Sequence, residues 1–496
     1  MLLKDLLDNL NYECLRGSVD CTVGAVRNDS RKVEAGDLFI CVSGMKKDGH
    51  DFIMSVIKKG VRALVVERDI ADSASDIFAV HGVTVIKVSC TRYAMAQIAA
   101  NYYRHPAKEL KTIAITGTKG KTTTTYLIKS VLEQAGYKVG LIGTIEIIIG
   151  EKHIPAENTT PESLLTQKYL REMADIGIQV VVMETASQGF KLHRTAGIVF
   201  DFGIFTNLSP DHIGPGEHED FAEYLACKRM LFSQCKQGFI NVDSEYYPEV
   251  IFGHTCEITT YGIENNADLR GSEIELYREN GNLGVHFKVE GLLSFGASVA
   301  SPGKFSVYNA LAAILVCRFF DVPVPVIFKA LRNVSVKGRI EMLPVADDFS
   351  LMIDYAHNAM SLLSLLKSLK EYQPGRLVCL FGCGGNRDKN RRIKMGEASG
   401  KLADLTIITS DNPRDEEPQD IINDIKSGIA KTNGEYVEII DRSEAIAYAL
   451  NNGRKGDIIV LAGKGHEDYQ EIKGKKYPMD EREIVKKCLN AMQTSS

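Results

Sequence analysis

The sequence predicts an α/β protein built from three domains. The chain has 496 residues, and domains of roughly 100–200 residues make three the expected number. Short apolar runs alternate with helical stretches along two separate parts of the chain, as they do in doubly wound sheets. Apolar residues make up 44% and charged residues 25% of the chain, which is the globular average and excludes a disordered or low-complexity protein.

Charge and cysteine content exclude further classes. The 59 basic and 64 acidic side chains give a formal charge of −5, so nothing general attracts the chain to nucleic acid. The 11 cysteines are scattered mostly one by one, which indicates reduced thiols. No run reaches the roughly 18 apolar residues of a membrane span, and the N-terminus lacks a secretory signal. We therefore expect a soluble cytoplasmic protein that binds neither membrane nor nucleic acid. We also expect a monomer, although none of these observations determines the oligomeric state.

Residues 1–108 are expected to form a first, smaller α/β domain. Apolar runs at 37–44, 63–67 and 83–89 predict short strands, and the spacing from Tyr93 to Tyr103 predicts a helix. The following segment, 104–110, contains Pro106 and is interpreted as a linker.

Residues 109–335 are expected to form a central domain with a mostly parallel sheet. A strand at 111–116, a Gly-rich turn and a helix at 122–136 open it. Continuous apolar runs follow, which favour parallel strands covered on both faces. We place these strands at 137–145, 178–185 and 198–207, helices at 221–235 and 306–320, and a β-rich stretch at 240–300.

Residues 336–496 repeat the alternation of strands with helices or loops. This pattern predicts a second doubly wound unit of the Rossmann-like type. Its expected strands are 351–355, 376–382, 404–410, 436–441 and 457–463.

The turn after the first central strand has the features of a phosphate-binding loop. Backbone N–H groups of a Gly-rich turn at a helix start bind anions. Lys121 is placed to reach the phosphates, and the Thr122 hydroxyl to bind Mg²⁺. Ile115 stands where the first Gly of the general motif would be. An ordinary strand-to-helix turn is the alternative, but the context favours nucleotide binding.

Glu184, His212 and Lys228 are weaker candidates when taken singly. Glu184 and His212 follow neighbouring strands, at the sheet edge where ligands gather, and together they could hold Mg²⁺. A solvated carboxylate and a structural histidine are the commoner interpretations. Lys228 lies among apolar residues of a helix, where a lysine usually extends its amine to water.

An ordered set of motifs then identifies a resemblance. GTKGKTTTTY, METASQGFKLHR, TNLSPDHIGPGEH, YLACKRMLF, KGRIEML, DYAHNAMSLL, FGCGGNRDKNRR, TSDNPRDEEP and AGKGHEDYQ occur in the order found in Mur ligases. The resemblance covers residues 29–467 and is strongest to the group that adds the third amino acid. It implies a UDP-binding domain at 1–108, an ATP-binding ligase domain at 109–335 and an amino-acid-binding domain at 336–496. The implied reaction joins an amino acid to UDP-N-acetylmuramoyl-L-alanyl-D-glutamate, with ATP as co-substrate and an acyl phosphate as intermediate, in peptidoglycan precursor synthesis.

The resemblance also implies roles at the phosphate site. Thr122 and Glu184 would serve one Mg²⁺, and Glu184 and His212 a second. Lys228 matches a lysine that the family carbamoylates, which would make it an anionic metal ligand. Lys121, Lys228 and His212 are the implied catalytic residues. The implied ATP-binding residues are Gly117, Thr118, Lys119, Gly120, Lys121, Thr122, Thr123, Asn309, Arg339, Asp354 and His357.

For the nucleotide-sugar dipeptide, the matching positions are Ser30, Asn158, Thr159, Thr160, Ser187 and Arg194. The sequence departs from the family at three places. Ala186 replaces a substrate-bonding Ser, so we expect Ser187 to supply the hydroxyl. Ala359 replaces a Pro, and RRIKMG at 391–396 replaces a usual KRPxMG.

The segment Asp411–Arg414 resembles the version that adds meso-diaminopimelate. Arg414 offers a planar fork that can bind the second carboxylate of that substrate bidentately, and it would repel the terminal ammonium of lysine. Outside the motif set, the same four residues would be taken as a turn with a solvated Arg. The implied amino-acid-binding residues are Arg387, Asp411, Asn412, Pro413, Arg414, Gly463 and Glu467.

Three alternatives stay open. The first is the same ligase with L-lysine or another diamino acid. The second is folylpolyglutamate synthase, which the N-terminal region and the motifs of the third domain disfavour. The third is a non-catalytic paralogue that binds UDP-sugar peptides. The paralogue is disfavoured because a binding protein has no use for the full set of Lys121, Thr122, Glu184, His212 and Lys228.

Overall fold

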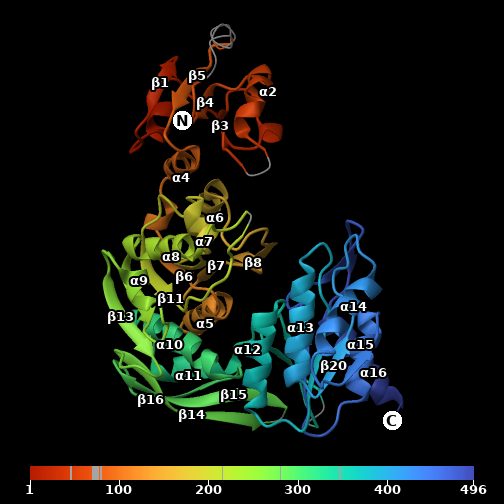
Figure 1. The fold of residues 1–496 in the computed structure, drawn as a ribbon. Helices are drawn as coiled ribbons and strands as arrows, with labels where there is room; N and C mark the ends of the chain where they lie inside the picture. Colours follow the sequence, from red (N-terminus) through yellow and green to blue (C-terminus); the bar gives the residue numbers. More distant parts are fainter. Residues whose placement is uncertain are drawn as a thin grey trace. The chain divides into compact units, whose positions relative to one another are not determined.

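The computed structural model of the chain describes residues 1–44, 47–69, 78, 81–214, 216–279, 281–345 and 348–495. Contacts among them divide the chain into two compact units (Figure 1). The first unit is Met1–Asp268 with Leu315–Phe320, and the second is Leu269–Ile314 with Asp321–Ser496. Pro215, within the TNLSPDHIGPGEH motif, lies outside the described residues.

The N-terminal part of the first unit is a five-stranded sheet between helices. The strand order is β1-β5-β4-β3-β2, parallel except for β1. Successive side chains of a strand point to opposite faces. One face therefore packs Leu38 and Ile40 with α1 and α4, and the other packs Phe39 with α2. The bounds are α1 Leu3–Leu6, β1 Glu13–Arg16, β2 Val26–Arg27, β3 Leu38–Ile40, α2 Ile53–Lys58, β4 Ala63–Val66, β5 Thr84–Lys87 and α4 Thr91–Tyr102.

The rest of the first unit is a larger sheet that carries the predicted phosphate loop. Its order is β13-β12-β11-β6-β10-β7-β8-β9, and the strands from β13 to β7 are parallel. The strands are β6 Lys111–Thr116, β7 Val139–Ile142, β8 Glu146–Ile149, β9 Lys152–Pro155, β10 Val180–Glu184, β11 Phe200–Phe205, β12 Cys235–Asn241 and β13 Glu257–Gly262.

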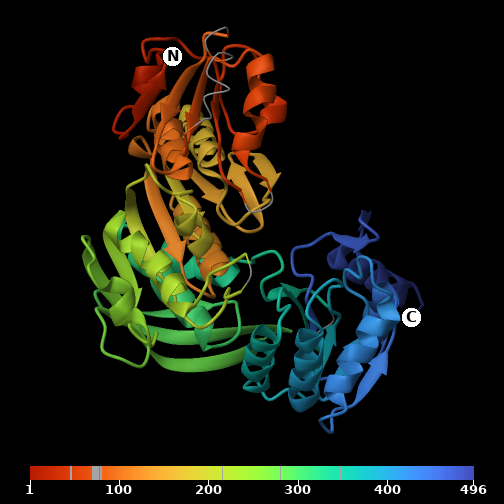
Figure 2. The ribbon, with the colours of Figure 1, turned by 45° about the horizontal axis from the view of Figure 1, so that its top comes forward.

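Helices cover this sheet. α6, α7, α8 and α9 contribute to one core with the strands. α5 packs on β6, β7 and β10 and contributes nothing to that core. α4 of the N-terminal part lies beside α6 (Figures 1 and 2). The bounds are α5 Lys121–Gln134, α6 Ser163–Asp175, α7 Ser187–Lys191, α8 Phe221–Arg229 and α9 Tyr247–Ile251.

Three expected elements of the first unit differ from the structure. The helix expected over 221–235 ends at Arg229 and gives way to a 3₁₀ turn, because β12 begins at Cys235 and pairs on both sides with β11 and β13. The strand expected over 137–145 ends at Ile142, and a hairpin to β8 follows. The expected linker contains a 3₁₀ turn at Pro106–Lys108.

The second unit begins with an antiparallel meander. β14, β15 and β16 form it, and α11 packs against β16 (Figure 1). The bounds are β14 Leu269–Glu279, β15 Asn282–Gly291, β16 Phe295–Val299, α10 Lys304–Phe319 and α11 Val324–Asn333; the end of α10, from Leu315, belongs to the first unit. This agrees with the β-rich stretch and the helix expected from the sequence.

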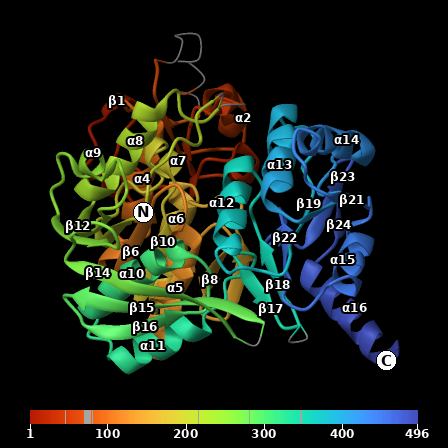
Figure 3. The same cartoon turned by 60° about the horizontal axis from the view of Figure 1, so that its bottom comes forward.

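The C-terminal sheet of the second unit has the order β17-β18-β22-β19-β20-β21 and is parallel except for the edge strand β17. α12, α13 and α14 cover one face, and α15 and α16 the other (Figure 3). A hairpin, β23–β24, follows β22. The bounds are β17 Glu341–Leu343, β18 Ser350–Asp354, α12 Ala359–Lys370, β19 Leu377–Phe381, α13 Lys389–Leu402, β20 Leu405–Ile408, α14 Pro418–Ile429, β21 Tyr436–Glu438, α15 Arg442–Asn451, β22 Ile458–Ala462, β23 Tyr469–Ile472, β24 Lys475–Pro478 and α16 Glu481–Ser495.

The predicted fold class is therefore confirmed: mixed α/β with mostly parallel sheets. The domain boundaries near 108 and 335 stay a prediction. All eleven cysteines are free thiols. Of the described helices, none combines the length and apolar character needed to cross a membrane.

Candidate active site

The phosphate loop joins the end of β6 to the start of α5. Parallel register places Glu184 opposite Ile115, and Phe205 opposite Thr116, so the ends of β10 and β11 flank the loop. Gly117 and Gly120 have φ of +147° and +86°, which side chains disfavour. A Cβ on Gly117 would also overlap the Thr206 hydroxyl. The loop is thus a tight backbone turn at a helix N-terminus, the geometry that binds phosphate.

Two lysines converge on one carbonyl of this loop. Lys121 Nζ donates to the carbonyl oxygens of Gly117 at 2.7 Å and Thr118 at 3.0 Å. Lys228 Nζ, from α8, donates to the same Gly117 oxygen at 2.9 Å and lies 4.6 Å from the ring centroid of Tyr224. The structure thus brings both predicted lysines to the loop.

Lys228 does not extend its amine to water, although a lysine among apolar residues of a helix usually does so. Its side chain is 1% exposed. Burial, and then the charge of Lys121, hold the pKa of the Lys228 amine well below its ordinary value. A neutral amine is the form that can attack carbon dioxide, so this environment suits carbamoylation.

Glu184 is fully buried and bonded on both carboxylate oxygens. Oε2 accepts from the hydroxyls of Thr122 and Thr144, each at 2.9 Å, and Oε1 accepts from the Thr144 backbone N–H at 2.8 Å. Gly143 allows this approach, because a Cβ there would lie 2.6 Å from Oε1. The predicted pair of Thr122 and Glu184 is therefore assembled. Thr144 was missed by sequence reasoning, since no motif marks it.

His212 stands apart from this pair. Its side chain is 48% exposed, and Nδ1 lies 3.2 Å from Glu217 Oε1. No hydrogen bond or ion pair joins it to Glu184 or Lys228 in the described part of the chain. Likewise, no group of three or more metal-ligating His, Cys, Asp or Glu side chains occurs among the described residues. The structure thus does not bring the second predicted metal site together.

Thr160 and Arg194, two of the positions predicted for the dipeptide, are in contact beside β10. Thr160 Oγ1 donates to the Glu184 carbonyl at 3.1 Å and accepts from the Ala186 N–H at 2.9 Å. Arg194 donates to the Thr160 carbonyl at 3.0 Å and to Glu162 at 2.7 Å. Its buried Nε has no partner in the described residues. Asn158 is exposed nearby, whereas Ser30 lies in a 3₁₀ turn of the N-terminal part.

Ser187 is paired with a histidine that the sequence analysis did not select. The Nε2 of His218 lies 2.8 Å from the Ser187 hydroxyl oxygen. On the other side of the ring, Nδ1 lies 3.4 Å from Glu223 Oε2. His218 is fully buried, and burial lowers the pKa of its ring. Its place in the DHIGPGEH motif was the available signal.

The remaining predicted ATP-binding residues belong to the second unit. Asn309 is buried on α10. Asp354 ends β18 and accepts from the backbone N–H groups of Ile340 and Ala356. Arg339 lies over the ring of Tyr355, 4.7 Å from its centroid. His357 Nδ1 donates to the Tyr355 carbonyl at 2.8 Å. Asp354, Arg339 and His357 thus gather at the end of β18.

Six of the seven predicted amino-acid-binding residues line one cavity of the second unit. The cavity has a volume of about 150 Å³. Its walls come from the ends of β18, β19, β20 and β22, the edge where parallel sheets bind ligands. The predicted residues lining it are Arg387, Asp411, Asn412, Arg414, Gly463 and Glu467, while Pro413 lines a neighbouring hollow.

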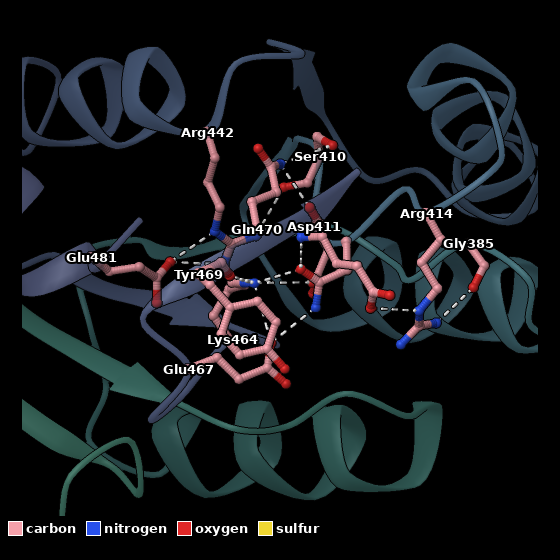
Figure 4. A network of polar contacts seen from close by, with 12 residues as sticks. Gly385, Ser410, Asp411, Arg414, Arg442, Lys464, Glu467, Tyr469, Gln470 and Glu481 are labelled. Atoms are coloured by element: carbon pink, nitrogen blue, oxygen red, sulfur yellow. Dashed lines mark hydrogen bonds and ion pairs between the residues drawn. The ribbon is translucent and has the colours of Figure 1, made fainter. Parts of the chain in front are cut away.

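Arg414 is held in place by the β23–β24 hairpin. Its Nε donates to Glu471 Oε2 at 3.1 Å, and another guanidinium nitrogen donates to the Gly385 carbonyl at 2.7 Å (Figure 4). Its backbone N–H donates to the Glu471 carbonyl. The expected fork is thus partly engaged within the protein, and a ligand would meet its remaining donors. Sequence reasoning missed the hairpin because its strands are short and polar.

A buried lysine, Lys464, bonds residues that line the other side of this cavity. Lys464 Nζ donates to Asn412 Oδ1 at 2.9 Å, to Glu467 Oε2 at 3.1 Å and to the Tyr469 carbonyl (Figure 4). Deeper still, Arg442 bonds Glu481 and the carbonyls of Ser410 and Ala462. These contacts hold the loops that follow β20 and β22 to one another.

The cavity carries both signs of charge. Arg392 is neutralised by Glu416 and Asp424, at 2.7 and 2.9 Å. Arg387 and Arg391, in contrast, form no ion pair within the described residues. Acidic Asp411 and Glu467 also line the cavity, and both contact Lys464. Such a cavity suits a ligand with both carboxylates and ammonium groups.

Comparisons with known proteins agree with this arrangement. The chain matches three families: "Mur ligase family, catalytic domain" over residues 22–103, "Mur ligase middle domain" over 115–317, and "Mur ligase, glutamate ligase domain" over 338–465.

Individual relatives extend the match to the whole chain. A UDP-N-acetylmuramoyl-L-alanyl-D-glutamate--2,6-diaminopimelate ligase of Caldanaerobacter subterraneus subsp. tengcongensis is 45% identical over 99% of both chains. One of the same name from Clostridium perfringens is 41% identical over 98% of this chain and 99% of its own. A solved structure of that name is 28% identical, covers 95% of each chain and has a TM-score of 0.69. On this evidence of full-length similarity, the chain belongs to the Mur ligase family.

Proposed function

We propose that the protein is an ATP-dependent ligase that adds meso-2,6-diaminopimelate to UDP-N-acetylmuramoyl-L-alanyl-D-glutamate. The observation that carries the proposal is the cavity lined by Arg387, Asp411, Asn412, Arg414 and Glu467. Full-length relatives that bear this activity in their names support the same conclusion. The product belongs to peptidoglycan precursor synthesis.

The charges of the cavity favour a diamino dicarboxylate. Arg414 retains donors beyond those it gives to Glu471 and Gly385, and these suit the distal carboxylate. Glu467 and Asp411 suit an ammonium group. L-lysine has no distal carboxylate and would leave Arg414 facing its terminal ammonium, which is unfavourable.

The chemistry proceeds in two steps. A carboxylate of the substrate's D-glutamate attacks the γ-phosphorus of ATP, ADP leaves, and an acyl phosphate forms. The amine of the incoming amino acid then attacks the acyl carbon, and the tetrahedral intermediate collapses with loss of phosphate and a proton. Lys121, which bonds the loop, and the N–H groups of the phosphate loop would offset the charge of the transferred phosphoryl group.

Thr122 and Glu184 fit a Mg²⁺ ion. The ion prefers oxygen ligands and keeps several from water and phosphate. The 2.9 Å separation of Thr122 Oγ1 from Glu184 Oε2 supports a shared ion. A second Mg²⁺ at Glu184 and carbamoylated Lys228 would need His212 to move, because its exposed ring contacts Glu217 and neither of those residues in this structure. Bound Mg²⁺ would neutralise phosphate charge.

The proposed substrates are small molecules, and we propose that the enzyme acts as a monomer in the cytoplasm. Phosphate release is the direct test. Purified protein should release phosphate only when ATP, the nucleotide dipeptide and meso-diaminopimelate are all present. Release that does not depend on the dipeptide or the amino acid would contradict a ligase.

A further inference from the structure

Lys464 is a buried cation at the centre of the loop that follows β22. Its side chain is fully buried. Its amine donates to Asn412, Glu467 and the Tyr469 carbonyl, and lies 3.7 Å from Asp411 Oδ1 (Figure 4). A buried charge is costly unless it is paired and hydrogen-bonded, and these oxygens meet that need.

Lys464 fixes which way the Asn412 amide faces. Asn412 Oδ1 accepts from Lys464 Nζ and from the Glu471 backbone N–H, both at 2.9 Å. Both partners are donors, so the oxygen must face them. The amide nitrogen then points the other way and donates to Glu467 Oε2 at 2.9 Å.

The same network aims the Glu467 carboxylate. Oε2 receives two donors, the amine of Lys464 and the amide of Asn412. Within the described residues, no protein group donates to Oε1 of Glu467, a residue that lines the cavity. An ammonium group of a ligand would therefore be accepted by Oε1.

Lys464 also balances charge. Asp411 and Glu467 both belong to the cavity wall, and both face the amine of Lys464. Removing that amine would leave two neighbouring carboxylates without their shared cation, and their mutual repulsion would move Glu467 from its place.

We infer that Lys464 is a positioning residue for the incoming amino acid. Through Asn412 and Glu467 it presents an acceptor to an ammonium group of the diamino acid, without touching that substrate itself. The inference rests on the proposed function and deepens it, because it concerns affinity for the amino acid and not for ATP.

The test compares two lysines that flank the same ring. Lys464 Nζ lies 5.3 Å and Lys476 Nζ 3.9 Å from the Tyr469 centroid, but Lys476 is exposed on β24. Lys464→Met should raise the KM for meso-diaminopimelate by about tenfold to a hundredfold, the range for a lost hydrogen bond to a charged group. The KM values for ATP and nucleotide dipeptide, and kcat, should change less than about twofold. The matched control, Lys476→Met, should leave all constants unchanged.

A double-mutant cycle separates positioning from a general loss of structure. Glu467→Gln should raise the amino-acid KM strongly in the wild-type background and less than about twofold in Lys464→Met, because the first change has already misaligned Glu467. Additive effects would overturn the inference. Should Lys464→Met not fold by circular dichroism, Lys464→Arg keeps the charge but changes the donor geometry, and the same selective rise in KM is expected.

The outcomes distinguish the two proposals. If the wild type forms no product with meso-diaminopimelate, the proposed function fails and the inference falls with it. If the wild type is active and a folded Lys464 variant keeps the wild-type KM, or loses kcat and all KM values together, the inference alone is overturned.

Discussion

The phosphate loop and the cavity proposed to bind the amino acid are built in different ways, although both are proposed to bind anionic groups. In the loop, Lys121 and Lys228 bond backbone carbonyls, and the shape comes from two glycines with positive φ. In the cavity, side chains bond one another, as Arg414 does with Glu471 and Lys464 with Glu467. The loop is a local backbone structure that one contiguous motif specifies. The cavity forms only when loops that are far apart in the sequence pack together in the folded chain.

The largest effect should come from the loop. Lys121→Met removes the cation that we propose offsets the charge of the transferred phosphoryl group, and kcat should fall by about 10²–10³-fold, as for loss of one group that stabilises transition-state charge. The control is Lys129→Met on the same helix, whose amine pairs with Glu133. It should retain activity within about twofold. Comparable activity of both variants in the phosphate-release assay would show that Lys121 has no catalytic role.

The next effect should come from the cavity and should be confined to one substrate. Arg414→Lys keeps the charge but loses the planar fork that spans Glu471 and Gly385. We expect the KM for meso-diaminopimelate to rise by about tenfold to a hundredfold, with the KM for ATP unchanged. Steady-state kinetics with each substrate varied in turn measures this. An unaltered amino-acid KM would remove Arg414 from the proposed site.

The same difference explains how far the sequence could predict the molecule. The strands and the phosphate loop follow from apolar runs and a local motif, and the resemblance to the family implied the pairing of Thr122 with Glu184. Thr144, Glu471 and Lys464 did not emerge, because their roles depend on side chains that meet only in space. The helix expected over 221–235 failed for a similar reason, since pairing of β12 with two neighbours decides the conformation from Cys235 onward.

A third prediction concerns stability of the first unit. Burial lowers the pKa of His218, whereas an unfolded histidine has a pKa of about 6.5. Below that pH, the imidazole of His218 binds a proton in the unfolded chain but resists it in the folded chain. The free energy of unfolding therefore decreases as the pH is lowered, by at most about 1.4 kcal/mol per pH unit. Well above about pH 6.5 the histidine is neutral in both states, so it no longer makes the free energy of unfolding depend on pH.

His218→Gln removes this contribution while keeping a polar side chain beside Ser187. Chemical denaturation of the wild type and the variant at pH 7.5 and 5.5 measures their free energies of unfolding. The difference by which the variant is less stable than the wild type should be smaller at pH 5.5 than at pH 7.5. A deficit that is the same at both pH values would mean that His218 is not the titrating group.

The smallest effect should follow from replacing Ala186, whose backbone N–H donates to Thr160, with the serine that the family resemblance implies at this position. Ala186 precedes α7 at the N-cap position, and no side chain caps the helix there. Ala186→Ser should stabilise the protein by about 0.5–1 kcal/mol, because serine caps helices better than alanine. Thermal unfolding measures the gain, and a melting temperature at or below that of the wild type would contradict it.

The central claim is that this cavity selects a diamino dicarboxylate. One ligase assay should offer meso-diaminopimelate, L-lysine and L-ornithine separately to the wild type with ATP and the nucleotide dipeptide, and identify products by mass spectrometry. The cavity's arginines predict efficient conversion of meso-diaminopimelate and a kcat/KM for the other two lower by about tenfold or more. Equal or better use of L-lysine or L-ornithine would contradict the assignment.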